Sequence, residues 1–340
     1  MENIYNYTEE DLNNYFTSIG EKTFRSRQVI SWVYRKKVTD FSLMSDIKKD
    51  LQETLKENFC FPKFTLVTKS VSSDGTIKFL FKLSDENLIE TVLMHQDYGY
   101  SLCVTSQVGC NMSCAFCASG LKKKVRNLTT GEMVLQVLMV EELANVKITH
   151  IVVMGIGEPF DNYDNLLKFL QIVNHPLGLE IGQRHLTVST CGLVPKIYEF
   201  SDFPLQVNLA ISLHAPNNTL RDKLMPVNHK YKIEELFKAL KYYYNKTGRR
   251  LTIEYILINE VNDNIKEALA LANLLKGMNA YVNLIPYNEV LENPFKRSKR
   301  ERQRAFYDTL KKQGINVTLR KEQGSDIAAA CGQLRSKYLK

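Results

Sequence analysis

The chain has 340 residues, of which 44% are hydrophobic and 24% charged, so it is long enough for one large core with a smaller domain added to it. It contains no apolar run of the roughly 18–20 residues that a membrane-spanning helix requires, and its polar, acidic first residues resemble neither a signal peptide nor a transit peptide. We therefore expect a cytoplasmic protein without a membrane partner. Seven cysteines, an odd number, argue against a disulfide framework and favour metal binding or catalysis.

The net charge of +8 is modest, but the basic residues are clustered. Residues 296–304 carry six basic side chains against one acidic side chain. A second cluster, residues 122–124 with Arg126, follows a group of cysteines. A single run of this kind is more often a solvated helix face. Two runs, one of them beside a candidate active site, favour a polyanionic substrate.

Residues 1–60 have a helical pattern, with Val29, Trp32 and Val33 on one stripe. Residues 64–83 switch to alternation of apolar and polar side chains around a turn at Asp74 and Gly75. This switch predicts a β-hairpin. We therefore assign residues 1–95 to a small N-terminal accessory domain that is helical, carries a β-hairpin and contacts RNA if the substrate is RNA.

From residue 100 onward, strand patterns alternate with longer helical patterns such as 131–144, 233–244 and 266–277. The expected strands cover residues 100–106, 149–155, 185–190, 206–214, 251–258 and 280–287. Six βα units in a row predict an α/β fold with a parallel sheet, either open or curled into a partial barrel. We assign residues 96–298 to this unit. Residues 299–340 form a C-terminal extension with a helix at about 299–313, a strand at 316–320 and a tail.

Ligands of such folds bind at the carboxyl ends of the strands. Segments rich in polar residues or glycine follow five of the expected strands. They are the cysteine-rich loop 109–120, MGIGEP (154–159), STCG (189–192), SLHAP (212–216) and PYN (286–288). The topology therefore predicts one concave site that all five segments face.

Cys110, Cys114 and Cys117 form a C-x-x-x-C-x-x-C triplet, a donor set that favours zinc or an iron–sulfur cluster. A structural zinc site normally has a fourth Cys or His nearby. The nearest later candidates are His150, in an expected buried strand, and Cys191. A 4Fe-4S cluster held by three cysteines has one open iron, where S-adenosylmethionine can bind and be cleaved reductively to a 5′-deoxyadenosyl radical.

This spacing, directly after the first strand of a (βα)6 pattern, resembles the radical S-adenosylmethionine (SAM) superfamily, as does the aromatic Phe116 before the last cysteine. Gly155 and Gly157 are expected to let the backbone approach a ligand closely. Glu158 is expected to accept a hydrogen bond from the cofactor's amine or ribose. Further polar contacts from successive strand ends are offered by Ser189, Ser212, His214 and Asn288.

Five colinear motifs narrow the resemblance: LCVTSQVGCNMSCAFCASG, MGIGEPF, SLHAPN, NLIPYN and GSDIAAACGQL. Together they resemble the dual-specificity 23S rRNA and tRNA adenine-C2 methyltransferases over roughly residues 20–337. The resemblance implies a partial (βα)6 radical-SAM barrel, one 4Fe-4S cluster on the triplet and two SAM molecules per turnover. Its substrates are an adenosine of the peptidyl transferase centre in 23S rRNA and the adenosine 3′ to the anticodon in some tRNAs. It also implies a monomer and a reducing electron donor such as flavodoxin or ferredoxin.

The resemblance assigns roles to three further residues. Cys331 first accepts a methyl group as a thiolate nucleophile, and a radical formed on that methyl adds to carbon 2 of adenine. Cys103 then attacks the Cys331 sulfur, and the transient disulfide releases the methylated base. Glu90, thirteen residues before Cys103, is the implied proton acceptor. The implied cofactor-binding residues are Gly157, Glu158, Ser189, Ser212, Leu213, His214 and Asn288.

An adenine in folded RNA must be unstacked before it can enter such a pocket. Phosphate contacts, which make binding salt-dependent, are expected from Arg25, Arg27 and residues 35–37, 122–126 and 296–304. Ala328 stands where the family usually has aspartate, which puts a local contact in doubt but not the activity. Cys60 and Cys191 are expected to be inert core residues.

Two alternatives stay open. A sister family methylates carbon 8 of the same ribosomal adenine with the same cysteines, but its motifs tend to read SQCGC and GEAL. This chain has SQVGC and GEPF, which favours carbon 2. The alternative from another class is a non-catalytic iron–sulfur or zinc RNA-binding protein, which would not cleave SAM when reduced.

Overall fold

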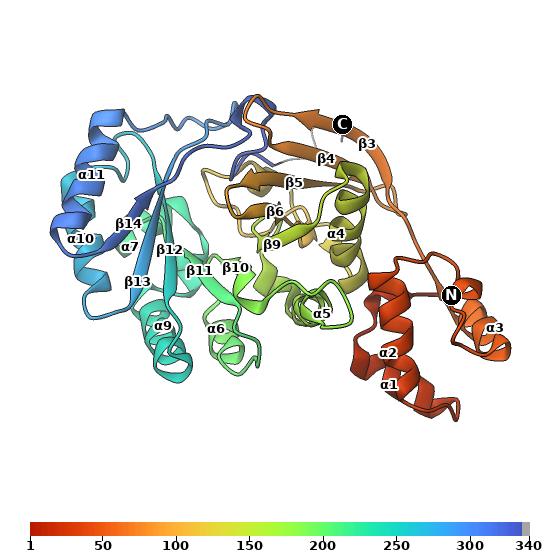
Figure 1. Ribbon diagram of the computed structural model, residues 1–340. Coiled ribbons are helices and arrows are strands. Elements are labelled where there is room, and N and C mark those ends of the chain that lie inside the picture. Colours follow the sequence, from red (N-terminus) through yellow and green to blue (C-terminus); the bar gives the residue numbers. More distant parts are fainter. Residues whose placement is uncertain (335–340) are drawn as a thin grey trace.

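The computed structural model describes residues 1–334. Ten strands in this range form one curved sheet with helices on its outer side (Figure 1). From one edge to the other they are β14 (Asn316–Leu319), β13 (Ala280–Pro286), β12 (Leu251–Leu257), β11 (Asn208–Ser212), β10 (Leu186–Thr190), β9 (Ile148–Val153), β6 (Gly99–Cys103), β5 (Leu88–Gln96), β4 (Ile77–Lys82) and β3 (Thr65–Val71).

In this sheet β6 and the strands from β9 to β14 are parallel, and each lies beside the sheet strand that precedes it in the chain. The intervening strands β7 (Gln107–Val108) and β8 (Arg126–Asn127) form a separate antiparallel pair. Right-handed βα crossovers produce this order, because each helix returns the chain to the start of the next strand. The helices between these strands are α4 (Thr130–Ala144), α5 (Tyr163–Asn174), α6 (Val194–Phe200), α7 (Asn218–Leu224), α8 (Val227–Lys230), α9 (Ile233–Thr247), α10 (Ile265–Leu275) and α11 (Arg300–Lys312). Within residues 1–334 the edge strands β14 and β3 do not pair with each other, so the barrel is partial. The expected α/β partial barrel is confirmed.

The predicted hairpin is β3 and β4, which pair antiparallel up to Val71 and Ile77. Asp74 accepts a hydrogen bond from the Thr76 N–H at 2.9 Å, and Gly75 takes a φ of +84° that favours glycine. β4 and β5 then continue the barrel sheet as antiparallel strands. The boundary expected at residue 95 falls inside β5, and the division into three parts stays a prediction. Residues 335–340 of its last part lie outside the described residues.

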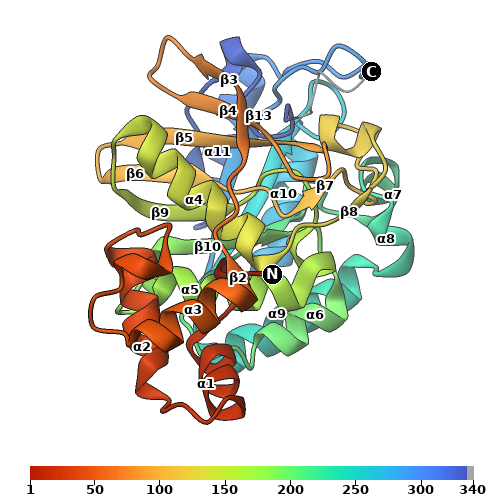
Figure 2. The ribbon, with the colours of Figure 1, turned by 90° about the vertical axis from the view of Figure 1, so that its right-hand side faces the viewer.

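The N-terminal residues form α1 (Glu9–Ser18), α2 (Phe24–Ile30) with a π-helical turn at Ser31–Arg35, and α3 (Lys49–Asn58). A capping box starts α1, because Thr8 and Asp11 exchange side-chain and backbone hydrogen bonds. These helices pack beside α4 and α5 (Figures 1 and 2), where the Gly131 N–H donates to Asn6 Oδ1 at 2.7 Å. A side chain at Gly131 would collide with Asn3. The short strands β1 (Glu2–Asn3) and β2 (Phe59–Cys60) close this unit.

The largest core lies between the sheet and its helices, with fully buried residues such as Val188, Leu209 and Leu240. A separate apolar cluster that includes Phe116, Met225 and Ile256 lies beside the cysteine loop and shields it from water. None of the helices within residues 1–334 has both the length and the apolar character needed to cross a membrane.

Candidate active site

A cavity of about 160 Å³ opens where the parallel strands end. Because carboxyl ends of parallel strands share one edge of the sheet, segments far apart in sequence meet there. From the predicted site, its lining includes Cys110, Cys114, Cys117, Gly157, Glu158, Ser189, Ser212, His214 and Cys331. Four of the five segments predicted to face one site contribute to this lining, whereas Pro286 and Asn288 of the fifth line a smaller adjoining cavity.

The cysteine loop is held by its own backbone. Gly109 has a φ of +77°, and a Cβ there would lie 2.3 Å from the Lys123 carbonyl oxygen. The Cys110 N–H donates to Lys122 O at 3.1 Å, and the Cys117 N–H donates to Cys114 O at 3.1 Å. These bonds turn all three thiols toward the same cavity.

Burial raises the pKa of Cys110 to about 12 and the pKa of Cys114 well above its usual range. Buried thiols of this kind stay neutral unless a cation binds them. They are therefore better suited to bind a metal than to act as nucleophiles, because a nucleophilic cysteine must be ionised and accessible. No three His, Cys, Asp or Glu side chains within residues 1–334 are grouped so that they could hold one metal ion. In an iron–sulfur cluster each thiolate binds a different iron, so the three sulfurs need not converge on one point.

Arg221 supplies a second indication of an anionic group at the triplet. Its side chain is fully buried, and its hydrogen bonds go to neutral oxygens, including Cys191 O at 2.6 Å and Asn228 Oδ1 at 3.0 Å. Burial lowers its pKa, and negative charge at Cys191, Cys114 or Asp222 opposes that shift. A buried cation bonded only to neutral groups is costly. A negatively charged cluster on Cys114 would offset that cost, so the residues present fit a 4Fe-4S group.

The MGIGEP turn packs against the segment that follows β6. A Cβ at Gly155 would lie 2.6 Å from Thr105 Oγ1, and a Cβ at Gly157 would lie 2.6 Å from Gln107 Cβ. Both glycines line the cavity, but the close packing between these two segments of the chain already explains why glycine is needed at both positions. Close approach of a ligand, the reason expected from the sequence, is therefore not needed to account for them.

Glu158 is buried and already accepts two backbone hydrogen bonds, from Phe160 at 3.0 Å and from Cys191 at 2.8 Å. It thereby ties the turn after β9 to the turn after β10. Burial raises its pKa in spite of these bonds. The carboxylate has further lone pairs, so a ligand donor is compatible with this arrangement. Cys191, expected to be core, is buried but also lines the cavity.

The expected contacts at the ends of β10 and β11 differ in their placement. Ser189 and Ser212 lie side by side, with 3.4 Å between their hydroxyl oxygens. His214 Nδ1 accepts the Ile256 N–H at 3.1 Å, and burial lowers the pKa of this histidine to about 3, so the ring is neutral. Leu213 is fully buried and does not line the cavity, and its N–H donates to Glu254 O.

A smaller cavity of about 40 Å³ adjoins the first one and contains Cys103. Cys331 and Arg320 line both cavities, so they stand between the triplet and Cys103. Arg320 Nη1 lies 3.6 Å from Cys331 Sγ. Asn288 lines only the smaller cavity, where its Nδ2 donates to Cys331 O at 3.2 Å. All seven cysteines are free thiols, so the transient disulfide implied between Cys103 and Cys331 stays a prediction.

Sequence reasoning missed Arg320 and Glu254 as site residues. Arg320 follows the last strand directly, and the same strand-end rule could have identified it. Glu254 is a buried carboxylate on β12 that lines the larger cavity and accepts from Asn283 at 2.9 Å. Burial raises its pKa. A single acidic residue in an otherwise apolar strand was the available signal.

Glu90 lies on β5 and is buried, with its Oε1 3.1 Å from Lys78 Nζ. Within residues 1–334 it is not part of either cavity wall. Val92 and Met94, two and four residues further along β5, do line the smaller cavity with Cys103. Since alternate residues of a strand share a face, Glu90 lies on the face that leads to Cys103.

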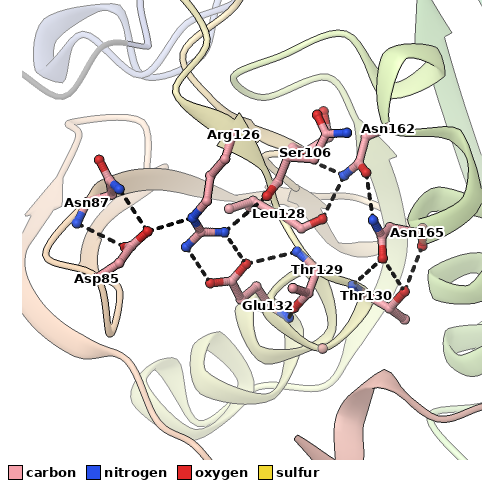
Figure 3. A network of polar contacts seen from close by, with 12 residues as sticks. Asp85, Asn87, Ser106, Arg126, Leu128, Thr129, Thr130, Glu132, Asn162 and Asn165 are labelled. Atoms are coloured by element: carbon pink, nitrogen blue, oxygen red, sulfur yellow. Dashed lines mark hydrogen bonds and ion pairs between the residues drawn. The ribbon is translucent and has the colours of Figure 1, made fainter.

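Several cations of the expected phosphate-binding clusters are engaged in ion pairs. Figure 3 shows Arg126 between Asp85 and Glu132, at 2.6 and 2.8 Å, in a network that joins the loop before β5 to the start of α4. Lys124 pairs with Asp161 at 2.6 Å. Further such pairs are Arg35 with Glu180, Lys37 with Glu141, Lys296 with Glu289, Arg297 with Glu322, Arg302 with Asp263 and Arg304 with Asp308. Exposed cations of these clusters include Lys122, Lys123, Lys299 and Arg300.

The partial barrel with three cavity-facing cysteines at its strand ends defines a radical SAM protein, and comparison with known proteins agrees. The profile of the Radical SAM superfamily matches residues 104–272, and that of the ribosomal RNA large subunit methyltransferase N-terminal domain matches residues 2–61. The probable dual-specificity RNA methyltransferase RlmN of Acholeplasma laidlawii is 56% identical over 336 residues, 99% of each chain. Its counterpart from Enterococcus faecalis is 54% identical over 347 residues, 100% of this chain and 97% of that protein.

Among solved structures, a radical SAM methyltransferase from Sphaerobacter thermophilus superposes with a TM-score of 0.91 at 42% identity, covering 99% of this chain and 100% of that one. The chain belongs to the RlmN family of radical SAM RNA methyltransferases, and it is an enzyme. The family expected from the sequence is confirmed. Membership also implies a 4Fe-4S cluster and SAM.

Proposed function

We propose that this enzyme methylates carbon 2 of an adenosine in the peptidyl transferase centre of 23S rRNA and of the adenosine 3′ to the anticodon in some tRNAs. It would do so through a methyl group carried on Cys331, with two SAM molecules consumed per turnover. The observation that carries the proposal is the position of Cys331, which lines both the cavity of the cysteine triplet and the cavity of Cys103. The relatives from Acholeplasma laidlawii and Enterococcus faecalis are named probable dual-specificity RNA methyltransferases, which agrees with two RNA substrates.

The triplet Cys110, Cys114 and Cys117 would hold the cluster, which when bound supplies the electron that cleaves SAM to a 5′-deoxyadenosyl radical. The buried Arg221 would offset the negative charge of a cluster bound at Cys114. The SAM contacts come from polar groups on neighbouring strand ends, with Asn288 reached by way of the smaller cavity. They are Gly157, Glu158, Ser189, Ser212, His214 and Asn288, whereas Leu213, expected from the sequence, is fully buried and lines neither cavity.

Cys331 acts first, as a thiolate that attacks the methyl carbon of one SAM molecule. A new carbon–sulfur bond forms as the methyl–sulfonium bond breaks and S-adenosylhomocysteine leaves. Arg320 donates to this sulfur and orients it. Transfer of one hydrogen atom from this methyl group to the 5′-deoxyadenosyl radical would give 5′-deoxyadenosine and leave a carbon radical on Cys331, which adds to the electron-poor carbon 2. A thiolate route is needed because that carbon and the methyl group of SAM are both electrophilic, so direct transfer between them has no nucleophile.

Glu90 takes the proton from carbon 2, and Lys78 holds its carboxylate in place. The adduct radical also gives up one electron to a one-electron carrier. Cys103 then attacks the Cys331 sulfur as a thiolate, the bond between that sulfur and the transferred carbon breaks as the disulfide forms, and the carbon takes up a proton from solvent to complete the methyl group. A reductant must reopen this disulfide before the next turnover. Flavodoxin or ferredoxin is the proposed electron donor, the enzyme is proposed to act as a monomer, and the proposed RNA substrates place it in the cytoplasm.

The test is the chemical identity of the product. Reconstituted protein and its Cys331→Ala variant are each incubated with SAM, a reductant and either a 23S rRNA fragment or tRNA, and the nucleosides are analysed by mass spectrometry. We expect 2-methyladenosine from both RNAs with the parent protein and none with Cys331→Ala. Formation of 8-methyladenosine as the sole product, or of 2-methyladenosine by Cys331→Ala, would contradict the proposal.

A further inference from the structure

The tail that carries Cys331 is held by the turn of the β3–β4 hairpin, about 250 residues earlier in the chain (Figure 1). Asp74 Oδ2 accepts the Gly324 N–H at 2.8 Å. Asp326 accepts the Ser72 hydroxyl at 2.5 Å and the Ser73 N–H at 3.0 Å. We call these five residues, Ser72, Ser73, Asp74, Gly324 and Asp326, the clasp.

The carboxylates of the clasp are favoured in their ionised form. Burial opposes ionisation of Asp74, but hydrogen bonds from the Thr76 and Gly324 backbone outweigh it and lower its pKa to about 2. The Ser72 hydroxyl and the Ser73 N–H lower the pKa of Asp326. Hydrogen bonds to ionised acceptors are stronger than those between neutral groups. The clasp therefore joins the hairpin turn to the tail through charge-assisted hydrogen bonds.

Beyond the clasp, the tail is fixed at further points on both sides of Cys331. Lys78 Nζ donates to Ala328 O at 3.1 Å, and the same ammonium contacts Glu90 at 3.1 Å. After Cys331, the Ala118 N–H of the cysteine loop donates to Gly332 O at 2.8 Å. The sulfur is thus held on a short span between the hairpin and the cysteine loop.

The span contains three left-handed backbone positions, Gly324 at φ +66°, Ala328 at φ +51° and Gly332 at φ +80°. Gly324 sits so close to the hairpin that a Cβ there would lie 2.8 Å from Ala329 Cβ and 2.9 Å from Thr76 Cγ2. Left-handed alanine is strained relative to aspartate or asparagine, so Ala328 needs its surroundings to hold it. The contacts of the clasp lie just before it in the chain, and Lys78 contacts the carbonyl oxygen of Ala328 itself.

We propose that the clasp is a positioning element for methyl transfer, which holds the Cys331 sulfur between the cysteine loop and Cys103. The proposal rests on the proposed function, in which Cys331 must reach a methyl donor, an adenine ring and Cys103 in turn. Such bond-forming steps lose rate steeply when a reacting group is misplaced by about an ångström. On this proposal the hairpin, which extends the barrel sheet beyond the cavities, serves to hold the tail that carries Cys331.

The test compares Asp326→Ala and Asp326→Asn with a matched control, Asp40→Ala. Asp40 caps the Ser42 N–H at 2.9 Å with a similar acceptor bond, but on the N-terminal unit. Alkylation of Cys331 by N-ethylmaleimide, resolved by peptide mass spectrometry, reports how firmly the tail is held. Loss of the ionised acceptor should raise the Cys331 alkylation rate about tenfold in Asp326→Ala. Asp326→Asn, which keeps a neutral acceptor, should lie between, and Asp40→Ala should match the parent protein.

The same variants separate positioning from mere stability. Asp326→Ala should lower kcat for RNA methylation about tenfold and leave KM for RNA unchanged, with partial rescue in Asp326→Asn. A parent-like alkylation rate together with parent-like kcat in Asp326→Ala would overturn the proposal. If Asp326→Ala fails to fold, Ser72→Ala serves instead, because it removes the Ser72 hydroxyl that donates to Asp326 and accepts from the Asp74 N–H but keeps the bond from the Ser73 N–H to Asp326. It should show a smaller change in the same direction, and no change would overturn the proposal.

Failure of the proposed function gives a different result. If the parent protein methylates RNA without ever carrying a methyl group on Cys331, the proposed function is wrong, irrespective of the results for the clasp variants. Faster alkylation of Cys331 in Asp326→Ala would still show that the clasp holds the tail, and unchanged kcat would then refute its role in methyl transfer.

Discussion

Arg320 donates a hydrogen bond to Cys331, with 3.6 Å between Nη1 and Sγ. The charge of Cys331 is also the main cause of the raised pKa of Arg320, ahead of the contributions of Glu254 and Cys103. One guanidinium therefore faces both cysteines of the proposed methyl-carrying pair. Arg320 fits the role of a group that orients sulfur for both the first and the last step.

Replacement of Arg320 by methionine should slow methylation of Cys331 about tenfold, because the sulfur loses a charged hydrogen-bond donor. Arg320→Lys should retain part of the rate, since it keeps the charge but not the planar fork. The measurement is the fraction of S-methylcysteine at position 331 over time, by mass spectrometry after a single exposure to SAM. Equal rates in Arg320→Met and the parent enzyme would refute this role.

Replacement of Cys103 by alanine should trap RNA covalently on Cys331, because nothing then attacks the Cys331 sulfur. The adduct is detected as a shifted band on a denaturing gel. The control is Cys60→Ala, which removes a cysteine of the N-terminal unit and should release free methylated RNA as the parent does. Normal release by Cys103→Ala would contradict its assignment.

The same step should depend on pH. Burial raises the pKa of Cys103 to about 12, so only a small thiolate fraction exists near neutrality. That fraction grows with pH everywhere below the pKa, so adduct release in the parent enzyme should accelerate from pH 7 to pH 9, by up to about tenfold per pH unit. Quenched time courses of adduct decay measure this, and a rate that falls with pH would rule the explanation out.

Replacement of Arg221 by methionine should weaken the cluster, because a fully buried positive charge near Cys114 is lost and the carbonyl of Cys191 loses its donor. We expect iron per chain after anaerobic reconstitution to fall by about half or more, and visible absorbance to fall with it. Arg304→Met, which removes an exposed arginine paired with Asp308, should keep the parent iron content. Full cluster loading in Arg221→Met would show that its charge is not needed.

Replacement of Glu90 by glutamine should slow proton removal from carbon 2 by about a hundredfold or more, in the range of general-base contributions. RNA should then accumulate as an adduct on Cys331 although Cys103 is present. Glu86→Gln is the matched control, since Glu86 pairs with Lys82 on the surface of the same part of the chain. Turnover of Glu90→Gln at the rate of Glu86→Gln would exclude Glu90 as the base.

The fold was largely predictable, because its signals are local. The β-branched runs mark the parallel strands, and Asp74 with Gly75 marks the hairpin. The parallel order then places the cysteine loop and the following strand ends at one edge. The triplet could be identified because its three ligands lie within eight residues.

Other features could not be read from the sequence because they depend on partners distant in the chain. Arg126 reads as a candidate phosphate ligand until folding brings it to Asp85 and Glu132. Gly157 reads as a ligand-binding glycine until its contact with Gln107 is seen. The clasp joins Asp74 to Gly324, and no local pattern predicts it.

The most direct test of the account follows the methyl hydrogens. The enzyme is given SAM whose methyl group carries three deuterium atoms, and the methylated adenosine is analysed by mass spectrometry. Because one hydrogen atom is removed from the methyl group on Cys331 and replaced from solvent after release, we predict 2-methyladenosine with two deuterium atoms in its methyl group. A methyl group that keeps all three deuterium atoms, or one attached to carbon 8, would contradict the account.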